Sequence, residues 1–289
     1  MYKRQVLVRA LSSELKVDVA ETAHRGHARE LAARAAGEGV DVVVALGGDG
    51  TVNEVANGLL AHGSPAPLLA VVPGGSTNVF SRALGRSRDP VEATAEILES
   101  LRTRPARTDD GWTDPRAFVF AAGLGYDAAV IARVEAQRAK GRRSTGALYI
   151  RSGVSSFLRS RERLRPPLTV QVPGQDPVEG VFLALVSNVD PWTYLGARPI
   201  RPTPRASFDT GLDVFALGRT GVVRMLTTLR QAMTADPDPH GRRVHRWHDL
   251  PEVTLTATRP QGWQLDGDHL GTTTGLRLRH VPDALRVVA

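Results

Sequence analysis

The sequence predicts an α/β N-terminal domain, built in three layers around a mainly parallel sheet, followed by a β-rich sandwich domain. Three observations lead to this prediction. Apolar strands alternate with helices in the first third of the chain, short strands between Pro and Gly clusters fill most of the rest, and 289 residues suffice for two domains. We expect the domains to comprise residues 1–108 and 109–280, with residues 281–289 packing back onto the first.

The composition is that of a folded, water-soluble protein, with 42% hydrophobic and 23% charged residues. No apolar run is long enough for a membrane-spanning helix, and the N-terminus lacks the pattern of a secretory signal. The absence of cysteine excludes disulfides, thiolate metal sites and cysteine nucleophiles. The net charge is +7, and 34 of the 37 basic residues are arginine, a fork-shaped partner for phosphate. Codon usage in a GC-rich genome explains the same excess of arginine.

The first domain is predicted element by element from apolar runs and helix-ending residues. ARELAARAA at 28–36 indicates a helix that ends at Gly37 and Gly39. The branched residues of 40–46 predict a strand buried on both faces. Thr51 and Glu54 stand three apart, the spacing of a capping box, and predict a helix over about 51–61.

A second strand–helix unit follows directly along the chain. Residues 68–72, LLAVV, predict another buried strand, and a helix is expected to begin near Asn78 and end before Gly85. Residues 90–101 predict a further amphipathic helix. This alternation of strand and helix is typical of a parallel sheet covered by helices.

Each of the two predicted strands runs into glycines just before a helix begins. GGDG follows the first strand at 47–50, and PGGSTN follows the second at 73–78. Backbone N–H groups are unpaired at a helix N-terminus and favour an anion, and glycine lets a ligand reach them. Two such turns at the carboxyl ends of adjacent strands point into one crevice. We therefore predict a phosphate-binding site there, although hydroxyls at a helix start also serve simply as caps.

The second domain is predicted to be mainly antiparallel. Residues 118–120 are expected to form a strand that leads into AAGLGYDAAV, and a basic, helical segment is expected over about 127–163. Short strands are then predicted at 168–172, 181–187, 212–217, 252–258, 262–265 and 275–279.

Five stretches, in order along the chain, resemble those of the diacylglycerol kinase-like lipid kinases, the family of the bacterial diacylglycerol kinases and sphingosine kinases. They are GGDGTVNEVANGL with VVPGGSTNVFSRALG, then FAAGLGYDAAV, FDTGLDVF and QLDGDHLG. NAD kinases and phosphofructokinases share GGDG, but the continuations favour the lipid kinases. The resemblance implies transfer of the γ-phosphoryl group of ATP, with Mg²⁺, to a lipid hydroxyl, of which diacylglycerol is the leading candidate.

The resemblance also implies roles for individual residues. The first loop and the helix after it would hold the nucleotide phosphates through Gly47, Gly48, Asp49, Gly50, Thr51, Asn53 and Glu54. Asp49 would lie near Mg²⁺ or a nucleotide hydroxyl and is counted among the catalytic residues. The second loop would contribute Gly75, Ser76, Thr77 and Asn78, with Ser76 where the family usually has threonine. Thr22 in ETAHRGHA matches an upstream family threonine, although a turn residue before a helix explains it nearly as well.

Asp268 is the predicted general base. It lies in Asp266-Gly267-Asp268, where the family usually reads Asp-Gly-Glu and the glutamate acts on the lipid hydroxyl. Aspartate is one methylene shorter, so the geometry must shift or the rate falls. The alternative is an Asp-Gly hairpin turn between two strands.

The sequence departs from the family in two further places. In FDTGLDVF the aspartate that usually binds a structural Mg²⁺ falls on Thr210, with Asp209 and Asp213 as the remaining metal ligands, so a weak or absent site is expected. No Asn-Pro pair occurs before residue 40, so the family's opening strand and turn are expected to be missing and the chain to be a fragment or to begin late.

The segment 138–165 contains nine Arg or Lys and one acidic residue beside apolar residues, and it predicts either contact with an anionic bilayer or an ordinary solvated helix. We expect a cytoplasmic protein, peripheral at the inner membrane face, and no nucleic-acid partner, because no recognisable nucleic-acid module occurs. The oligomeric state, monomer or homodimer, stays open. The alternative functions are a soluble NAD kinase and a non-catalytic nucleotide- or lipid-binding relic.

Overall fold

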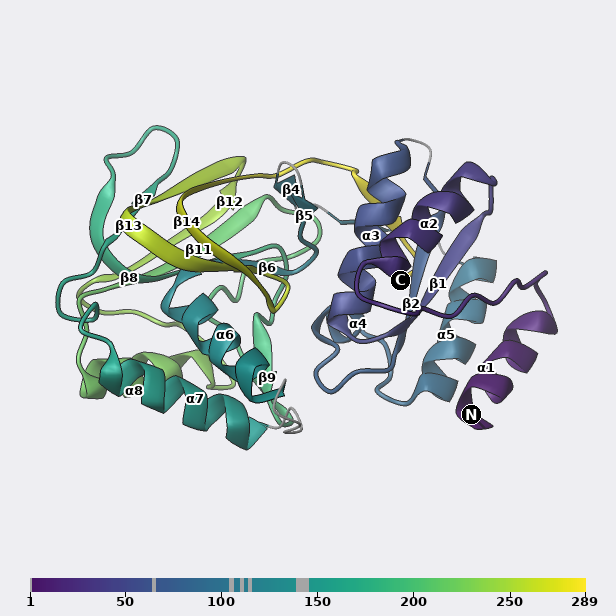
Figure 1. Ribbon diagram of the computed structural model, residues 1–289, viewed down its shortest axis with the longest axis horizontal. Coiled ribbons are helices and arrows are strands. Elements are labelled where there is room, and N and C mark those ends of the chain that lie inside the picture. The colour runs from purple at the N-terminus through teal and green to yellow at the C-terminus, as the bar shows by residue number, and fades with distance from the viewer. Residues whose placement is uncertain (1, 64–65, 104–106, 110–111, 114–115, 139–145) are drawn as a thin grey trace. The chain divides into compact units, whose positions relative to one another are not determined.

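The structure is a computed structural model that describes residues 2–63, 66–103, 107–109, 112–113, 116–138 and 146–289. The chain divides into two compact units (Figure 1). Unit 1 consists of Met1–Asp110 and Pro282–Ala289, and unit 2 of Gly111–Val281. The predicted architecture, an α/β domain with a mainly parallel sheet followed by a β-rich domain, is confirmed.

Unit 1 is built around a four-stranded sheet in the order β1-β2-β15-β3. Its strands are β1 (Val42–Gly47), β2 (Leu68–Pro73), β3 (Arg107–Asp109) and β15 (Leu285–Val287). β1 and β15 both pair with β2 in parallel, and β3 is antiparallel to β15. The last described strand of the chain therefore lies in the middle of the first sheet.

Helices cover both faces of this sheet. They are α1 (Tyr2–Ser12), α2 (His27–Gly37), α3 (Asp49–His62), α4 (Val79–Ala83) and α5 (Pro90–Thr103). Leu7 of α1 and Ile97 of α5 pack with Ala70 and Val72 of β2 on one face. α3 lies against β1, and α2 packs on α3, where Gly58 allows a close approach: a Cβ there would lie 2.3 Å from the carbonyl oxygen of Arg29.

Two expectations for this region are wrong. β1 is not buried on both faces, because it lies at the edge of the sheet in the described part of the chain, and Leu46 is 43% exposed. Thr51 and Glu54 do not form a capping box, because α3 begins two residues before Thr51, with Gly48 as the N-cap. Glu54 instead accepts hydrogen bonds from the backbone N–H groups of Gly26 and Ala28, at 2.8 and 3.2 Å, and so caps the start of α2.

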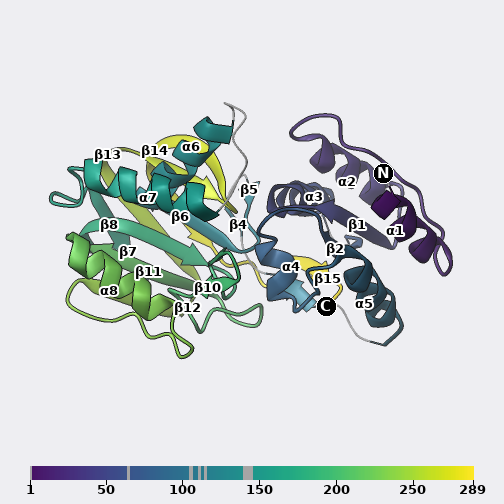
Figure 2. The ribbon, with the colours of Figure 1, turned by 90° about the horizontal axis from the view of Figure 1, so that it is seen from below.

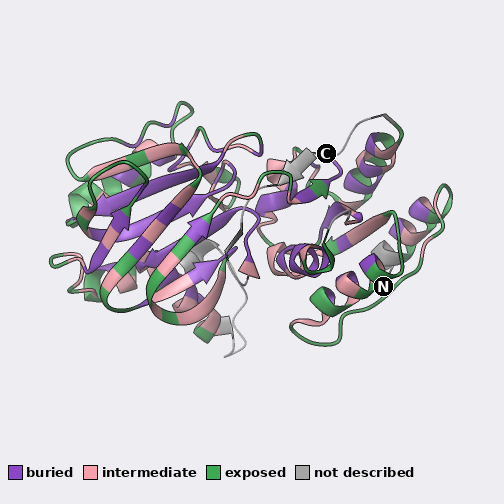
Figure 3. Ribbon diagram, turned by 90° about the horizontal axis from the view of Figure 1, so that it is seen from above, coloured by how far each residue is buried: buried purple, intermediate pink, exposed green. Residues whose placement is uncertain are grey.

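Unit 2 contains a nine-stranded sheet in the order β12-β11-β8-β6-β13-β14-β4-β5, with β7 pairing both β13 and β8. Its strands are β4 (Trp112–Thr113), β5 (Arg116–Ala117), β6 (Ala121–Gly125), β7 (Leu168–Gln171), β8 (Val178–Ser187), β11 (Leu212–Gly218), β12 (Val244–Leu250), β13 (Glu252–Leu265) and β14 (Asp268–Arg279). β8 and β11 are buried along most of their length (Figure 3). A separate hairpin pairs β9 (Thr193–Leu195) with β10 (Arg198–Ile200).

Three helices of unit 2 pack on one face of this sheet (Figures 1 and 2). They are α6 (Tyr126–Arg138), α7 (Gly146–Arg159) and α8 (Val222–Ala232). Tyr126 of α6, Phe157 of α7 and Met225 of α8 contact one apolar cluster on β8 and β11. The helical segment expected over 127–163 is thus two helices, and part of its basic run, residues 139–145, lies outside the described residues.

The remaining differences concern strand limits. The strand expected at 118–120 is wrong, because those buried residues precede β6, which begins at Ala121. The strands expected at 252–258 and 262–265 form one long strand, β13, with shifts of register between Thr256 and Gln264. Helix α8 and strand β12 were not predicted from the sequence. Among the described helices, none is both long and apolar enough to cross a membrane.

Candidate active site

The two glycine loops of unit 1 lie against each other. Gly47 and Pro73 are partners in the parallel pairing of β1 with β2, so both strands end at the same edge of the sheet. The N–H of Gly74 donates to the carbonyl oxygen of Gly47 at 2.7 Å. A Cβ built on Gly75 would lie 2.6 Å from the Cα of Gly48, and one built on Gly74 would lie 3.1 Å from the Cα of Gly47. Glycine is therefore required for the close approach of the loops.

Each loop is fixed by side chains from the helix that follows it. The side chain of Thr51 fills the space beside Gly47, where a Cβ would come within 2.6 Å of it. Asn78, in the left-handed region with φ of 50°, accepts a hydrogen bond from the N–H of Gly75 at 2.8 Å and donates one to its carbonyl oxygen at 3.0 Å. These bonds hold the second loop rigid beside the first.

Asp49 joins the two loops. Its carboxylate accepts a hydrogen bond from the backbone N–H of Phe80, at the start of α4, at 3.3 Å. Asp49 itself is the first residue of α3, so a carboxylate lies between the starts of two helices. Gly74, Gly75 and Ser76 are exposed beside it. The arrangement offers backbone N–H groups and a hydroxyl to an anion, and a carboxylate to a cation that accompanies it.

The other predicted nucleotide-binding residues are placed less directly. Gly50, Thr51 and Thr77 belong to the loops or the first turn of α3, and Thr22 is an exposed residue of the segment before α2. Asn53 is fully buried within α3, which leaves its side chain no exposed surface for a ligand. Glu54 is engaged with the N-terminus of α2. Glu54 therefore supports α2 behind the loops.

Asp268, the predicted base, belongs to unit 2. It is the first residue of β14 and follows a hairpin turn made by Asp266 and Gly267, whose φ angles of 49° and 80° suit Asp-Gly. Asp268 is partly buried, and its carboxylate pairs with the guanidinium of Arg116 at 3.2 Å. Arg116 was not identified from the sequence, because the short strand β5 that carries it lies far from Asp268 along the chain.

Asp266 fastens this hairpin to the neighbouring strand. Its buried carboxylate accepts hydrogen bonds from the backbone N–H groups of Val119 at 2.8 Å and of Phe120 and Ala121 at 3.0 Å. The preceding residues supply a second anchor, because Gln264 accepts from the N–H of Gly267 at 2.9 Å. The turn that presents Asp268 is thus built on a rigid support.

A second buried carboxylate lies beneath the same hairpin. Asp127, in the first turn of α6, accepts a hydrogen bond from the side-chain amide of Gln264 at 2.9 Å. Burial raises the pKa of Asp127 to about 7, although the hydrogen bond from Gln264 opposes the rise. Gly123 makes room for this carboxylate, since a Cβ there would lie 2.4 Å from its Oδ2. The Asp127 carboxyl therefore gains or loses its proton, and with it changes its charge, when the pH changes slightly around neutrality.

The two residues predicted to bind a structural metal ion, Asp209 and Asp213, lie in different surroundings. Asp213 is almost fully buried, and its Oδ1 accepts hydrogen bonds from His248 at 2.7 Å and from the N–H of Asp249 at 3.1 Å. Asp209 is exposed in the preceding turn. Over the described part of the chain, no group of three or more His, Asp or Glu side chains is arranged to hold a metal ion. Asp213 instead orients β11 and β12 through hydrogen bonds.

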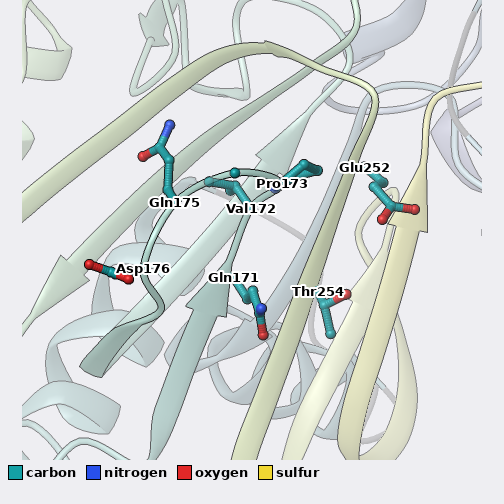
Figure 4. Close-up of a pocket in the computed structure, with 8 residues that line it drawn as sticks. Gln171, Val172, Pro173, Gln175, Asp176, Glu252 and Thr254 are labelled. Carbon is teal, nitrogen blue, oxygen red and sulfur yellow. The ribbon is translucent and has the colours of Figure 1, made fainter.

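A polar groove of about 640 Å³ lies elsewhere in unit 2, between the turn that joins β7 to β8 and the start of β13 (Figure 4). Gln175 and Asp176 of the turn and Glu252 and Thr254 of β13 line it. None of the predicted site residues does. The charged residues of its lining are the carboxylates Asp176 and Glu252, with no Arg or Lys, so the groove does not suit a phosphate. We therefore place the candidate phosphate site at the glycine loops of unit 1.

Comparison with known sequences identifies the first unit. Residues 3–108 match the family model of the diacylglycerol kinase catalytic domain. The diacylglycerol kinase of Bacillus subtilis (strain 168) is 37% identical over 121 residues, which cover 42% of this chain and 39% of that protein. A probable lipid kinase, YegS-like, of Stenotrophomonas maltophilia (strain K279a) is 29% identical over 282 residues, 94% of this chain and 86% of the relative. The match thus spans less than half of the Bacillus protein.

Solved structures share the fold of the whole chain. A diacylglycerol kinase from Bacillus anthracis superimposes with a TM-score of 0.71 at 20% identity, covering 99% of this chain and 90% of that one. An NAD kinase from Archaeoglobus fulgidus in complex with ATP gives a TM-score of 0.53 at 13% identity, covering 100% and 89%. Residues 3–108 therefore match the diacylglycerol kinase catalytic domain, and the chain as a whole shares the fold of a diacylglycerol kinase from Bacillus anthracis.

Proposed function

We propose that this protein is an ATP- and Mg²⁺-dependent lipid kinase that phosphorylates diacylglycerol to phosphatidate at the inner face of the membrane. The observation that carries the proposal is the apposition of the two glycine loops at the carboxyl ends of β1 and β2. A loop pair of this kind, opening onto two helix N-termini with a carboxylate between them, suits a polyphosphate and its cation.

Each group has a defined task in the proposed reaction. The loop N–H groups and Ser76 would hold the ATP phosphates, and Asp49 would hold a Mg²⁺ ion, which would offset the phosphate charge. The acceptor hydroxyl oxygen forms a bond to the γ-phosphorus as the bond to the bridging β–γ oxygen breaks, and ADP leaves with that electron pair. Asp268 receives the hydroxyl proton, and Arg116 orients the Asp268 carboxylate. Phosphoryl transfer depends mainly on such positioning and charge neutralisation.

Diacylglycerol is proposed as the acceptor because sequence relatives of this chain are named diacylglycerol kinases. The YegS-like relatives carry only the broader name of lipid kinase. Unit 2, which is rich in antiparallel strands, would bind the lipid acceptor. Sphingoid, ceramide-like and polyprenol acceptors are the natural comparisons.

The test uses labelled ATP and diacylglycerol in mixed micelles. The parent should form labelled phosphatidate, and Asp268→Ala should lower turnover by about 10² to 10⁴-fold, the usual contribution of a general base, while ATP binding is retained. Glu179→Ala, which removes an exposed carboxylate of β8 outside the proposed site, is the matched control and should be as fast as the parent.

Two results would refute the proposal. Phosphorylation of NAD in the absence of lipid, with no lipid product, would identify a soluble NAD kinase. Binding of ATP without phosphorylation of diacylglycerol or of the sphingoid, ceramide-like and polyprenol acceptors would identify a nucleotide-binding protein without kinase activity. If Asp268→Ala turned over like the parent, the base would lie elsewhere even though a lipid kinase was present.

A further inference from the structure

Helix α8 carries a stripe of large apolar side chains on the side that faces away from the protein. Its inner side contacts the apolar cluster of β8 and β11 through Met225. On its outer side Val222 is 45% exposed, Val223 79%, Leu226 59% and Leu229 37%. Residues three and four apart lie on one helix face, so these four form a continuous stripe.

The neighbouring helix α7 extends this stripe. Phe157 of α7 packs on the same cluster as Met225, so both helices cover one face of the sheet (Figure 2). On the outer side Val154 and Leu158, one turn apart, are 53% and 58% exposed. Leu164, in the segment after α7, is 47% exposed, and that segment is joined to the start of α8 by a hydrogen bond from the N–H of Thr220 to the carbonyl oxygen of Arg163 at 3.1 Å.

We call the outer sides of α7 and α8, together with Leu164, the α7–α8 surface. Among the described residues, it holds every large hydrophobic side chain that unit 2 exposes, because the other four in the chain, Val19, Val40, Leu46 and Val91, belong to unit 1. Scattered single apolar residues are normal on a protein surface, but a cluster of this kind marks an interaction site.

Arginines surround the apolar residues of this surface. A groove of about 760 Å³ at the start of α8 is lined by Leu164, Val222 and Val223 together with Arg219, Arg224, Arg242 and Arg243. Within the part of the chain that the structure describes, none of these four arginines forms an ion pair with a carboxylate. Neither α7 nor α8 contains an acidic residue. The exposed apolar stripe is therefore bordered by uncompensated positive charge.

We propose that the α7–α8 surface docks this protein onto an anionic lipid bilayer. Helix α8 would lie in the plane of the interface with its apolar stripe below the headgroups, and the arginines of the groove would contact lipid phosphates. Amphipathic helices with an apolar face and basic flanks bind membranes in this way. A second copy of the chain fits poorly, because the surface has no carboxylates to meet the arginines of its partner. The choice of a bilayer over a protein groove rests on the proposed function, whose acceptor is a membrane lipid.

The experiment measures co-sedimentation of the full chain with phosphatidylcholine vesicles, with and without phosphatidylglycerol, in the absence of ATP. The parent should bind the anionic vesicles and bind the neutral ones weakly. Replacing both Val223 and Leu226 by glutamate should lower the partition coefficient by at least about tenfold. The control is Val91→Glu, which places one glutamate at an exposed apolar position of α5 in unit 1 and should bind like the parent.

Two further variants test the details. Arg242→Ala and Arg219→Ala should each weaken binding to anionic vesicles by about fivefold, the factor for one basic side chain near a charged bilayer. Val223→Trp should gain blue-shifted emission on anionic vesicles, which would place the side chain below the headgroups.

The proposal is overturned if the parent does not bind anionic vesicles, if Val91→Glu loses as much affinity as the α8 variant, or if the α8 glutamates have no effect. A concentration-dependent dimer that the α8 glutamates dissociate, with no affinity for vesicles, would show that the surface is a protein interface. Turnover of a short-chain, monomeric diacylglycerol reports separately on the proposed kinase activity. If the parent does not phosphorylate this short-chain diacylglycerol, the proposed function is refuted. If the parent does, the α8 variant should phosphorylate it at the same rate.

Discussion

Gly75 shows how a single missing side chain shapes the candidate site. Its Cα is so near the first loop that a Cβ would lie 2.6 Å from the Cα of Gly48 and 2.9 Å from the Oδ1 of Asn78. Neither neighbour can move freely, because one is backbone and the other holds the second loop in place through two hydrogen bonds. The separation of the loops is therefore set by the absence of a methyl group.

Gly75→Ala is expected to force the loops apart and to weaken ATP binding. Overpacking of this kind costs about 1–3 kcal/mol, and each 1.4 kcal/mol that falls on the bound state is about tenfold in Kd. Calorimetric titration with ATP measures the change. Gly37→Ala is the matched control, because its Cβ would meet only a side-chain atom of His62, at 3.9 Å. Equal affinities in parent and Gly75→Ala would show that the phosphates do not bind between the loops.

Asp127 makes the stability of unit 2 depend on pH. Burial raises its pKa from 3.8 to about 7, so the folded state holds the proton more tightly than the unfolded chain. The free energy of unfolding therefore decreases as the pH rises between these two values, by roughly 4 kcal/mol at about 1.4 kcal/mol per pH unit.

Asp127→Asn should remove this decrease. The variant is expected to equal the parent near pH 4 and to be more stable at pH 8 by up to about 4 kcal/mol. Urea unfolding followed by tryptophan fluorescence measures it, since all four tryptophans belong to unit 2. A parent whose stability is flat between pH 4 and pH 8 would contradict the raised pKa.

At the scale of secondary-structure elements, the sequence predicted the strands and helices that carry the glycine loops, but not the contacts that these elements make. β1, β2, α3 and α4 were found from branched apolar runs and from the glycines that end them, because these signals are local. The partner of Glu54 was missed, because a carboxylate three residues after Thr51 looks like a capping box, while its real partners lie on α2. β1 was expected in the interior, and only the order of strands reveals it as an edge.

Glu54→Ala tests whether this residue supports a helix or binds the nucleotide. The substitution leaves the N–H groups of Gly26 and Ala28 without their acceptor, and losing such a cap typically costs about 1 kcal/mol. We expect urea denaturation followed by circular dichroism to show this loss, with little change in the Kd for ATP. If the variant were as stable as the parent but its Kd for ATP rose strongly, Glu54 would be a nucleotide-binding residue.

The roles of Asp268 and α8 illustrate two different limits of sequence reasoning. Asp268 was found through the motif around it, but its partner Arg116 comes from another strand and carries no local signal. The apolar residues of α8 have a clear helical period, yet a period does not say which face is buried. Only the packing of Met225 and the exposure of Val223 distinguish the two faces.

For the whole molecule, the important feature is that the chain leaves unit 1, forms unit 2 and returns. β15 lies between β2 and β3, so the sheet of unit 1 is closed by residues from the far end of the described chain. Leu285, Val287 and Val288 of this return are almost fully buried. One glycine loop follows β2, which pairs with β15, and the other follows β1 on the far side of β2, so both loops depend on the same sheet.

Val287→Asp should therefore disable nucleotide binding from a distance in the sequence. A charged side chain in place of a valine that is 1% exposed is expected to cost several kcal/mol and to unfold unit 1 selectively. Proteolysis with mass spectrometry should show cleavage within unit 1, together with loss of ATP binding and an intact unit 2. The exposed position Arg286 offers the control Arg286→Ala, which should resist proteolysis. Equal protection of unit 1 in both variants would mean that β15 is dispensable.

The position of β15 also has a consequence for the order of events during synthesis. The ribosome releases β1 and β2 first, but the strand that completes their sheet emerges only after the whole of unit 2. Domains usually mature in the order in which they are translated. Here unit 2 can fold completely before unit 1, because the sheet of unit 1 lacks β15 until the end of the chain has been made. A released chain that ends before residue 282 should then hold a folded unit 2 attached to a unit 1 whose sheet lacks β15.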